Sequence, residues 1–354
     1  MLLAIESSCD ETSVALFDSF KVLEHGKSIG EAYLGQLIKS QVDLHSLYGG
    51  VVPELAARQH SEALPKMVNS ILEKYNVTYS ELKHIAVTSG PGLKGCLLVG
   101  LSYAKGLSEA LGIPIIPINH LEGHVLSYSL EFDATDQFPL LCLLVSGGHS
   151  EIVLVDGIGH YKILCETSDD AAGEAFDKIG TLLGIKYPAG KELSELARKC
   201  SISDFTFPEA VQKDFSTFSF SGLKTAVKRE IESYKKVNTT LDEDYRSSIA
   251  WAVQNAIVNA LLTKLEYWVR TIKPKALVLA GGVAANSRLR KEIEYFSDTY
   301  SIPVLKPKNE FCTDNAAMIG AAGLLRLRES LYSDDMVLKS RSIGAVPRWS
   351  LEAI

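Results

Sequence analysis

The sequence of 354 residues lacks paired cysteine motifs, long apolar runs and an excess of positive charge. Its six cysteines are scattered and form no Cys-x-x-Cys pair, which argues against a zinc ribbon or a disulfide framework and favours reduced thiols. Every long apolar run is interrupted by a charged residue, glycine or proline, so no membrane association is expected. The chain begins on an apolar strand without a basic leader, which predicts a cytoplasmic protein. The net charge of −7 excludes a generally basic nucleic-acid coat but allows a local basic patch.

The sequence also lacks the Walker A pattern, which excludes a P-loop fold. It does contain a Gly-x-Gly-x-x-Gly pattern, Gly90-Pro-Gly-Leu-Lys-Gly95. A dinucleotide fold needs this turn in its first strand–helix unit and an acidic residue at the end of the next strand. Here the turn comes later in the chain, and the next strand ends at Ile118-Asn119. We therefore interpret it as a tight turn that brings a helix close to a sheet.

The chain is longer than one core usually serves, and its pattern of strands and helices occurs twice. Each half begins with a polar-tipped hairpin, at 2–17 and at 140–155, and continues with helices, strands and glycine turns. Duplicated α/β lobes predict the two-lobe actin-like and sugar-kinase-like (ASKHA) fold. We expect the lobes to be 1–125 plus 316–354 and 126–315, with nucleotide and metal in the cleft between them.

Two histidines, His120 and His124, follow an apolar strand and are four residues apart. On a helix they lie on one face, one turn apart, and can bind one metal ion. The pair is similar to the zinc-protease motif, but there a glutamate directly follows the first histidine, and Leu121 stands here instead. Glu122 points elsewhere on the helix. A surface or capping pair is the alternative that this stretch alone leaves open.

The tips of both predicted hairpins are polar. The first, Ser7 to Thr12, gathers hydroxyls and carboxylates that suit a phosphate or a metal–nucleotide complex, although a solvated tip fits equally well. In the second tip, Gly147 and Gly148 allow backbone N–H groups to approach an anion.

Two regions show no clear period: we interpret 18–52 as mixed and polar, and 333–354 as a loosely structured tail. Amphipathic helices are expected at 54–75 and 245–271. A small-residue helix is expected from 316, with Thr313 or Asp314 as its N-cap.

Nine segments in order along the chain resemble one family, the TsaD family of tRNA N6-adenosine threonylcarbamoyltransferases, long mislabelled as O-sialoglycoprotein endopeptidases. A single segment is weak evidence, but nine in register are specific. The segments are Ile5-Glu-Ser-Ser-Cys-Asp-Glu-Thr12, Tyr48-Gly-Gly-Val-Val-Pro-Glu-Leu-Ala56, Gly90-Pro-Gly-Leu-Lys-Gly95, His120-Leu-Glu-Gly-His124, Leu144-Val-Ser-Gly-Gly-His149, Asp169-Asp-Ala-Ala-Gly-Glu-Ala-Phe-Asp-Lys178, Phe218-Ser-Phe-Ser-Gly-Leu-Lys224, Ala280-Gly-Gly-Val-Ala-Ala-Asn286 and Phe311-Cys-Thr-Asp-Asn315.

The resemblance implies one divalent metal ion per subunit, bound by His120, His124 and Asp314. Iron is the usual ion, and Zn²⁺ suits the same mixed nitrogen and oxygen ligands. It also implies a set of nucleotide contacts. These are Leu144, Val145, Ser146, Gly147, Gly148, Asp177, Gly190 and Asn286.

The implied reaction transfers a threonylcarbamoyl group from threonylcarbamoyl-AMP to N6 of the adenosine immediately 3′ of the anticodon, in tRNAs reading codons that begin with A. Bacterial members of the family work with a catalytically inert paralogue and a small accessory ATPase, whereas mitochondrial members act without them. The alternatives are a small-molecule kinase of the same fold, a metalloprotease and a non-catalytic scaffold paralogue.

The donor is already activated, so no protein nucleophile is expected, and Asp10 or Glu11 is our candidate for accepting the N6 proton. The chain departs from the family at Asn119, where many members have another histidine. It departs again at Tyr187-Pro-Ala-Gly-Lys191, where the usual turn is Tyr-Pro-Gly-Gly-Pro. Two basic clusters are candidates for tRNA contact. The first is Lys224, Lys228, Arg229, Lys235 and Lys236, and the second is Arg326, Arg328, Lys339, Arg341 and Arg348.

Overall fold

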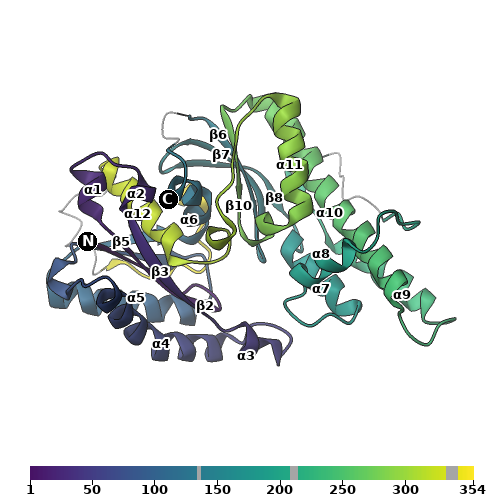
Figure 1. Cartoon of the computed structure of the whole chain (residues 1–354), viewed down its shortest axis with the longest axis horizontal. Helices are drawn as coiled ribbons and strands as arrows, with labels where there is room; N and C mark the ends of the chain where they lie inside the picture. Colours follow the sequence, from purple (N-terminus) through teal and green to yellow (C-terminus); the bar gives the residue numbers. More distant parts are fainter. Residues whose placement is uncertain (134–136, 208–213, 332–341) are drawn as a thin grey trace. The chain divides into compact units, whose positions relative to one another are not determined.

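The computed structural model describes residues 1–133, 137–207, 214–331 and 342–354, and it contains two mixed α/β units (Figure 1). Unit 1 comprises Met1–Asp136, Asp156–Lys162 and Pro307–Ile354, and unit 2 comprises Gln137–Val155 and Ile163–Lys306. No helix within the described ranges is both long enough and apolar enough to span a membrane.

Unit 1 is built on a five-stranded sheet in the order β3-β2-β1-β4-β5. Its strands are β1 Leu2–Glu6, β2 Glu11–Phe17, β3 Tyr33–Ser40, β4 His84–Gly90 and β5 Ile115–Asn119. The predicted first hairpin is confirmed, because β1 and β2 pair antiparallel with Ile5 opposite Val14. On the other side of β1, β4 and β5 run parallel to it, so the three strands end at the same edge.

Helices cover both faces of this sheet, and the alternation of side chains along the strands explains why. Leu3 and Leu16 pack against α4 (Pro53–Lys74) and α5 (Lys94–Leu111), which Figure 1 shows side by side. Leu2 and Phe17 are one residue away along their strands, and they face α12 (Ala316–Arg328) on the other side. A Cβ at Gly320 of α12 would overlap the Phe17 ring, so the small residues of this helix allow its close approach.

The remaining helices of unit 1 are short. They are α1 Ser19–Leu23, α2 Ile29–Ala32, α3 Val42–Ser46, α6 His120–Leu126 and the 3₁₀ turns Tyr79–Glu81, Ser127–Leu130, Asn309–Phe311 and Leu351–Ala353.

Unit 2 is built on a six-stranded sheet in the order β11-β10-β6-β7-β8-β9. Its strands are β6 Leu140–Val145, β7 Ser150–Gly157, β8 His160–Thr167, β9 Thr217–Phe218, β10 Ala276–Ala280 and β11 Val304–Leu305. Its helices are α7 Ala172–Leu182, α8 Gly190–Ala197, α9 Ser221–Tyr234, α10 Glu243–Ile272, α11 Ser287–Tyr300 and the 3₁₀ turn Gly282–Ala285.

The two sheets repeat one plan, which confirms the predicted fold class. In unit 1 an antiparallel hairpin, β1 and β2, is followed on the β1 side by the parallel strands β4 and β5. In unit 2 the hairpin β6 and β7 is followed on the β6 side by the parallel strands β10 and β11. Strand β3, which lies in the stretch interpreted as mixed and polar, takes the same place as β8.

The units differ from the expected lobes at three places, of which the first is residues 126–133, which group with unit 1. The segment from Pro307 to Asn315 groups with unit 1, because Phe311 packs edge-on against Tyr33 and Ala316 N–H donates to Ser13 Oγ at 2.9 Å. The segment Asp156–Lys162, which comprises the end of β7, the following turn and the start of β8, also groups with unit 1. All three predicted metal ligands therefore lie in one unit, and the expectation that Asp314 belongs to the second lobe is corrected.

The described part of the C-terminal tail is bound to the Gly90 turn. Val346 N–H donates to Ser89 O at 2.7 Å, and Gly92 N–H donates to Pro347 O at 3.2 Å. Gly90 has φ +154° and lies against the Val346 carbonyl, so no side chain fits there. The expectation of a loose tail is therefore corrected for residues 343–349, because Val346 and Pro347 are bound to this turn and the main chain of Ile343 and Trp349 accepts from Lys105 and Asn119.

Candidate metal centre and nucleotide-binding turns

Helix α6 places the two histidines on one buried face. Asn119 ends β5 and caps the helix, since its Oδ1 accepts from Leu121 N–H at 2.9 Å and Glu122 N–H at 3.3 Å. His120 is 7% exposed and His124 is fully buried, and their rings meet edge to face at 4.8 Å between centroids. The surface-pair alternative does not describe a helix whose seven residues are all buried.

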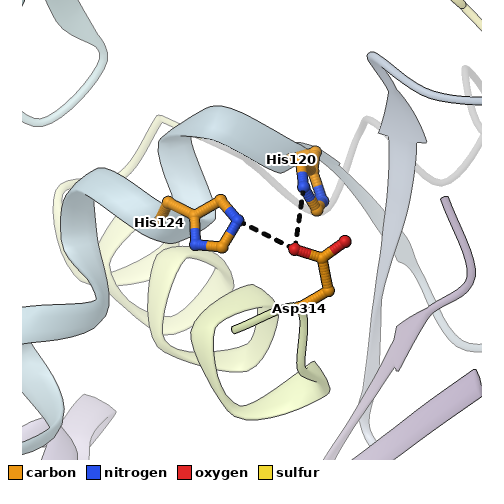
Figure 2. Close-up of side chains that lie close together, drawn as sticks. All are labelled: His120, His124 and Asp314. Carbon is orange, nitrogen blue, oxygen red and sulfur yellow. Dashed lines mark hydrogen bonds and ion pairs between the residues drawn. The ribbon is translucent and has the colours of Figure 1, made fainter. Parts of the chain in front are cut away.

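Asp314 reaches these histidines from the segment before α12. Asn315 caps that helix by accepting from Met318 N–H at 2.9 Å, so the expected capping role of Thr313 or Asp314 falls to the next residue. Asp314 Oδ1 lies 3.1 Å from His124 Nε2 and 3.5 Å from His120 Nε2 (Figure 2). One ligand atom from each residue lies within 4.8 Å of the other two, which is a spacing that one cation can bridge.

A fourth residue, Glu6 at the end of β1, orients His120 from the other side of its ring. Glu6 Oε2 lies 3.0 Å from His120 Nδ1 and accepts from Thr88 Oγ–H at 2.6 Å, and Glu6 Oε1 accepts from Ser8 N–H at 2.5 Å. With Nδ1–H directed at a carboxylate, Nε2 is the nitrogen that faces Asp314. Sequence reasoning missed Glu6 as a support for the site.

The charges of this cluster are strongly coupled. Burial favours the neutral carboxyl of Asp314, but the adjacent His120 and His124 hold its pKa well below its usual range. Burial likewise disfavours the charged imidazole, yet Asp314 and Glu6 raise the pKa of His120 well above its usual range. Burial lowers the pKa of His124. In the metal-free chain, the proton on His120 Nε2 thus faces Asp314, at the place where a bound cation would lie.

The predicted proton acceptors lie on the tip of the first hairpin. Burial and the carboxylates of Asp314 and Asp10 raise the pKa of Glu11 to about 9, so Glu11 is protonated at neutral pH in the metal-free chain. The tip is held by His60 of α4, another residue that sequence reasoning missed. Its Nδ1 lies 2.7 Å from Thr12 Oγ1, and its Nε2–H donates to Cys9 O at 2.9 Å.

The predicted nucleotide contacts all lie in unit 2. Leu144 and Val145 end the buried strand β6, and the following turn at Gly147 and Gly148 has open space where side chains would stand. The turn after β10 approaches it closely, since Gly281 has φ +88° and a Cβ there would overlap Val145 O. The start of α7 meets the same turn, where Glu174 N–H donates to Gly147 O at 3.1 Å.

Three of these residues are tied to their neighbours. Asp177 Oδ1 accepts from Ala189 N–H at 2.8 Å and Gly190 N–H at 3.0 Å, while burial raises the pKa of its carboxyl. Asn286 Oδ1 caps α11, and its Nδ2 donates to Gln254 Oε1 at 3.0 Å. Both ends of the Asn286 amide are therefore used inside the unit, where they tie the start of α11 to α10.

Comparison with known proteins identifies the family. A family model described as TsaD, tRNA N6-adenosine threonylcarbamoyltransferase, matches residues 32–321. The chain belongs to the TsaD family. A relative from Carboxydothermus hydrogenoformans with this same enzyme name is 46% identical over 336 residues, covering 94% of each chain. A relative from Nitrosomonas eutropha, also so named, is 44% identical over 353 residues, covering 99% of each.

Solved structures share only the fold. HypF from T. kodakarensis matches with a TM-score of 0.59 and 14% identity over 93% of this chain and 48% of that one. The component A of (R)-2-hydroxyglutaryl-CoA dehydratase from Acidaminococcus fermentans matches with a TM-score of 0.50 and 12% identity, over 93% of this chain and 99% of that one. TsaD membership bears out the resemblance and weighs against the kinase and protease alternatives.

The structure accounts for one departure from the TsaD family pattern. Asn119, where many members have a histidine, is the N-cap of α6, and its Nδ2 also donates to Trp349 O in the tail at 3.0 Å. Asparagine is among the best residues for such a cap. Ala189, in the second departure, is buried against Gly180 of α7.

The basic clusters proposed for the tRNA of this TsaD protein are only partly exposed. Arg326 is buried in an ion pair with Glu122, so it is corrected from a phosphate contact to an internal residue. Lys224 pairs with Asp170, and the exposed Lys228 pairs with Glu232. Lys339 and Arg341 lie outside the described residues. Arg229, Lys235, Lys236 and Arg348 are exposed.

Proposed function

We propose that this TsaD-family chain transfers the threonylcarbamoyl group of threonylcarbamoyl-AMP to N6 of the adenosine immediately 3′ of the anticodon, in tRNAs reading codons that begin with A. The family match supports the reaction class. The observation that carries the proposal is the cluster of the buried His120 and His124 with the partly exposed Asp314, whose ligand atoms lie within 4.8 Å of one another.

The residues present fit one divalent cation, Fe²⁺ or Zn²⁺. Two imidazole nitrogens and one carboxylate oxygen form a donor set typical of either ion. Glu6 behind His120 is the kind of carboxylate support that accompanies metal-bound histidines. When bound, a cation on three protein ligands keeps open positions and polarises a substrate oxygen.

The other groups of the chain have positioning and electrostatic tasks, because the mixed anhydride of the donor is already activated. Backbone N–H groups at Gly147 and Gly148 suit the adenylate phosphate, and Asp177 and Gly190 form a wall beside the ribose and base. Asp10 on the first hairpin tip accepts the N6 proton. Glu11 beside it carries its own proton in the metal-free chain, because its pKa is about 9.

We also propose that tRNA is held through phosphate contacts from the exposed cations of the α9 region and the tail, Arg229, Lys235, Lys236 and Arg348. With a net charge of −7, the chain alone binds tRNA weakly, and an inert paralogue and a small accessory ATPase assist it as in bacterial systems. These partners and the tRNA substrate fit a cytoplasmic location.

A reconstitution tests the proposal. The chain is incubated with threonine, bicarbonate, ATP, the upstream synthase, the accessory proteins and tRNA, and the nucleosides are analysed by mass spectrometry. Threonylcarbamoyladenosine at the position after the anticodon is expected. Its absence from the complete mixture would contradict the proposed reaction.

Substitution of the ligands tests the metal centre separately. His120→Ala and His124→Ala are expected to lose both bound metal, measured by elemental analysis, and transfer. His25→Ala is the matched control, because His25 is an exposed histidine of the same unit whose ring meets Phe20 edge to face, away from the metal ligands. Full transfer by a metal-free variant would refute the role of the cation while leaving the reaction itself intact.

A further inference from the structure

Glu122 lies between the two ligand histidines in the sequence and on the opposite face of α6 in space. It is two residues from each histidine, which corresponds to just over half a helical turn. Its side chain is fully buried. The proposed reaction gives it no task, although a buried carboxylate is costly to keep unless it is paired.

Two buried residues hold this carboxylate. Arg326 Nε lies 2.9 Å from both Oε1 and Oε2 of Glu122, and Tyr161 O–H donates to Oε1 at 2.8 Å. Arg326 is 6% exposed and Tyr161 is 9% exposed. Arg326 is in the last turn of α12, and Tyr161 lies in the short stretch Asp156–Lys162 that groups with unit 1.

The segment from Asp314 to Arg326, which contains most of α12, therefore touches both faces of α6. Asp314, just before α12, meets the histidine face, and Arg326, near its end, meets the Glu122 face. Between these points the helices pack at Gly123, where a Cβ would lie 2.9 Å from Ile319 Cδ1. Because α12 packs closely on the sheet of unit 1, its position is fixed, and its contacts can fix the position of α6.

A short helix depends on contacts with its neighbours to keep its orientation. Helix α6 has seven residues, fewer than a helix needs to be stable by itself, so its contacts set its rotation about its own axis. Side-chain tips lie about 6 Å from a helix axis, so a rotation of about 10° moves an imidazole nitrogen by about 1 Å. Metal–ligand distances tolerate only about 0.2 Å.

We propose that Arg326 and Tyr161, acting through Glu122, are positioning residues that fix the rotation of α6 and so set His120 and His124 against Asp314. The inference rests on the proposed metal centre and adds to it three residues that touch neither the metal nor a substrate. Loss of the Glu122–Arg326 ion pair lets α6 rotate or fray at the metal site, while the rest of unit 1 stays folded.

A purely stabilising ion pair would behave differently. It would lower the melting temperature when removed, but the folded fraction of the protein would bind metal with unchanged affinity and geometry. Metal affinity and the ligand field of the bound ion separate the two roles.

The test is a Co²⁺ titration of the full metal-free chain, followed by the visible absorption of the bound ion, which depends on the number and arrangement of its ligands. Glu122→Gln and Arg326→Lys are expected to raise the Co²⁺ Kd about tenfold and to change the absorption envelope. Tyr161→Phe removes one hydrogen bond and is expected to raise it less. Unchanged Kd and spectrum in all three variants would overturn the proposal.

Arg328→Gln is the matched control, because Arg328 is in the same turn of α12 but pairs with its neighbour Glu329. Its Co²⁺ Kd and spectrum are expected to equal those of the unmodified chain, and an equal loss there would overturn the specific role of Arg326. If a single variant does not fold, the double variant Glu122→Met/Arg326→Met replaces the pair by apolar groups of similar length, which proteins tolerate. A folded double variant with unchanged Co²⁺ binding would likewise overturn the proposal.

The outcomes also separate this inference from the proposed function. If the unmodified chain binds no Co²⁺, the metal centre itself fails, and the positioning role fails with it. If the unmodified chain binds Co²⁺ and His120→Ala does not, the metal centre stands. The variants at Glu122, Arg326 and Tyr161 then decide the positioning role alone.

Discussion

Glu6→Gln is the sharpest test of how the metal centre is supported. The Glu6 carboxylate is fully buried and receives three donors: Ser8 N–H on Oε1, and Thr88 O–H and His120 Nδ1–H on Oε2. A glutamine has the same shape but only one accepting oxygen. One of the two sides must therefore receive an amide NH₂ instead.

Both orientations of the glutamine weaken metal binding. With NH₂ toward His120, Nδ1 becomes the acceptor and the proton moves to Nε2, the nitrogen that faces Asp314. With NH₂ toward Ser8, the neutral amide oxygen accepts from His120 Nδ1–H in place of a carboxylate, so the imidazole becomes a weaker metal ligand. Two donors also face each other in a dry site, which costs about 1–3 kcal/mol of folding stability. Loss of such a support typically weakens metal affinity about 10–100-fold, or about 1.4–2.7 kcal/mol.

The assay is a titration of the metal-free chain with Co²⁺ or Zn²⁺, with circular dichroism as the test of folding. Glu81→Gln is the matched control, since Glu81 is an exposed carboxylate of unit 1 that accepts from Thr78. A folded Glu6→Gln protein that binds metal as tightly as the unmodified chain would refute the tautomer argument.

Two further outcomes are expected, one from the tight turn at Gly281 and one from the burial of His60. Gly281→Ala puts a Cβ against Val145 O at φ +88° and is expected to destabilise the protein by about 2 kcal/mol or more in thermal unfolding, whereas Gly222→Ala, with open space, changes stability little. His60 is buried, and burial lowers its pKa below the unfolded value near 6.5. The unfolded state therefore binds more protons below that pH, so stability is full above about pH 6.5 and falls as the solution becomes more acidic, by at most about 1.4 kcal/mol per pH unit. Urea unfolding measures the free energy of unfolding at pH 7.5 and 5.5. We expect this free energy to fall less between the two pH values for His60→Gln than for the unmodified chain, and to fall equally for the exposed His160→Gln.

Local patterns predicted much of the fold and part of the site. The hairpins β1 with β2 and β6 with β7 can be predicted from the sequence, because each joins two apolar runs that are neighbours along the chain and pair in space. The spacing of His120 and His124 is likewise a local signal, since one helical turn separates them. Asp314 came from the family resemblance, because nothing near it in sequence indicates a histidine partner.

Glu6 was missed because its role depends on strands that are distant in sequence. It ends β1, Asn119 ends β5, and both strands run parallel to β4, so their carboxyl ends meet at one edge of the sheet. Applied to the predicted strands, that rule would have pointed to Glu6. Arg326 was assigned to tRNA because a charged residue on a helix is usually exposed, and only the fold reveals its buried partner.

The first lobe boundary was placed directly after the histidine pair, at residue 125, and the second at the start of the small-residue helix. Contacts that no local pattern encodes moved both boundaries, notably those of the Ser127–Leu130 turn with α12 and of Phe311 with Tyr33. Strand β3 was missed because its edge position leaves much of it polar and partly exposed, which gives a weak alternation.

The two units share one sheet plan, but the groups at the end of the first hairpin strand suit ligands of opposite charge. The strand that starts the hairpin ends in a carboxylate, Glu6, in unit 1, and in a glycine turn at Gly147 in unit 2. In the proposed function, the equivalent position thus supports a cation in one unit and an anion in the other. A chelator and a phosphate analogue should therefore act on separate halves of the same chain, so that each half can be titrated while the other is left intact.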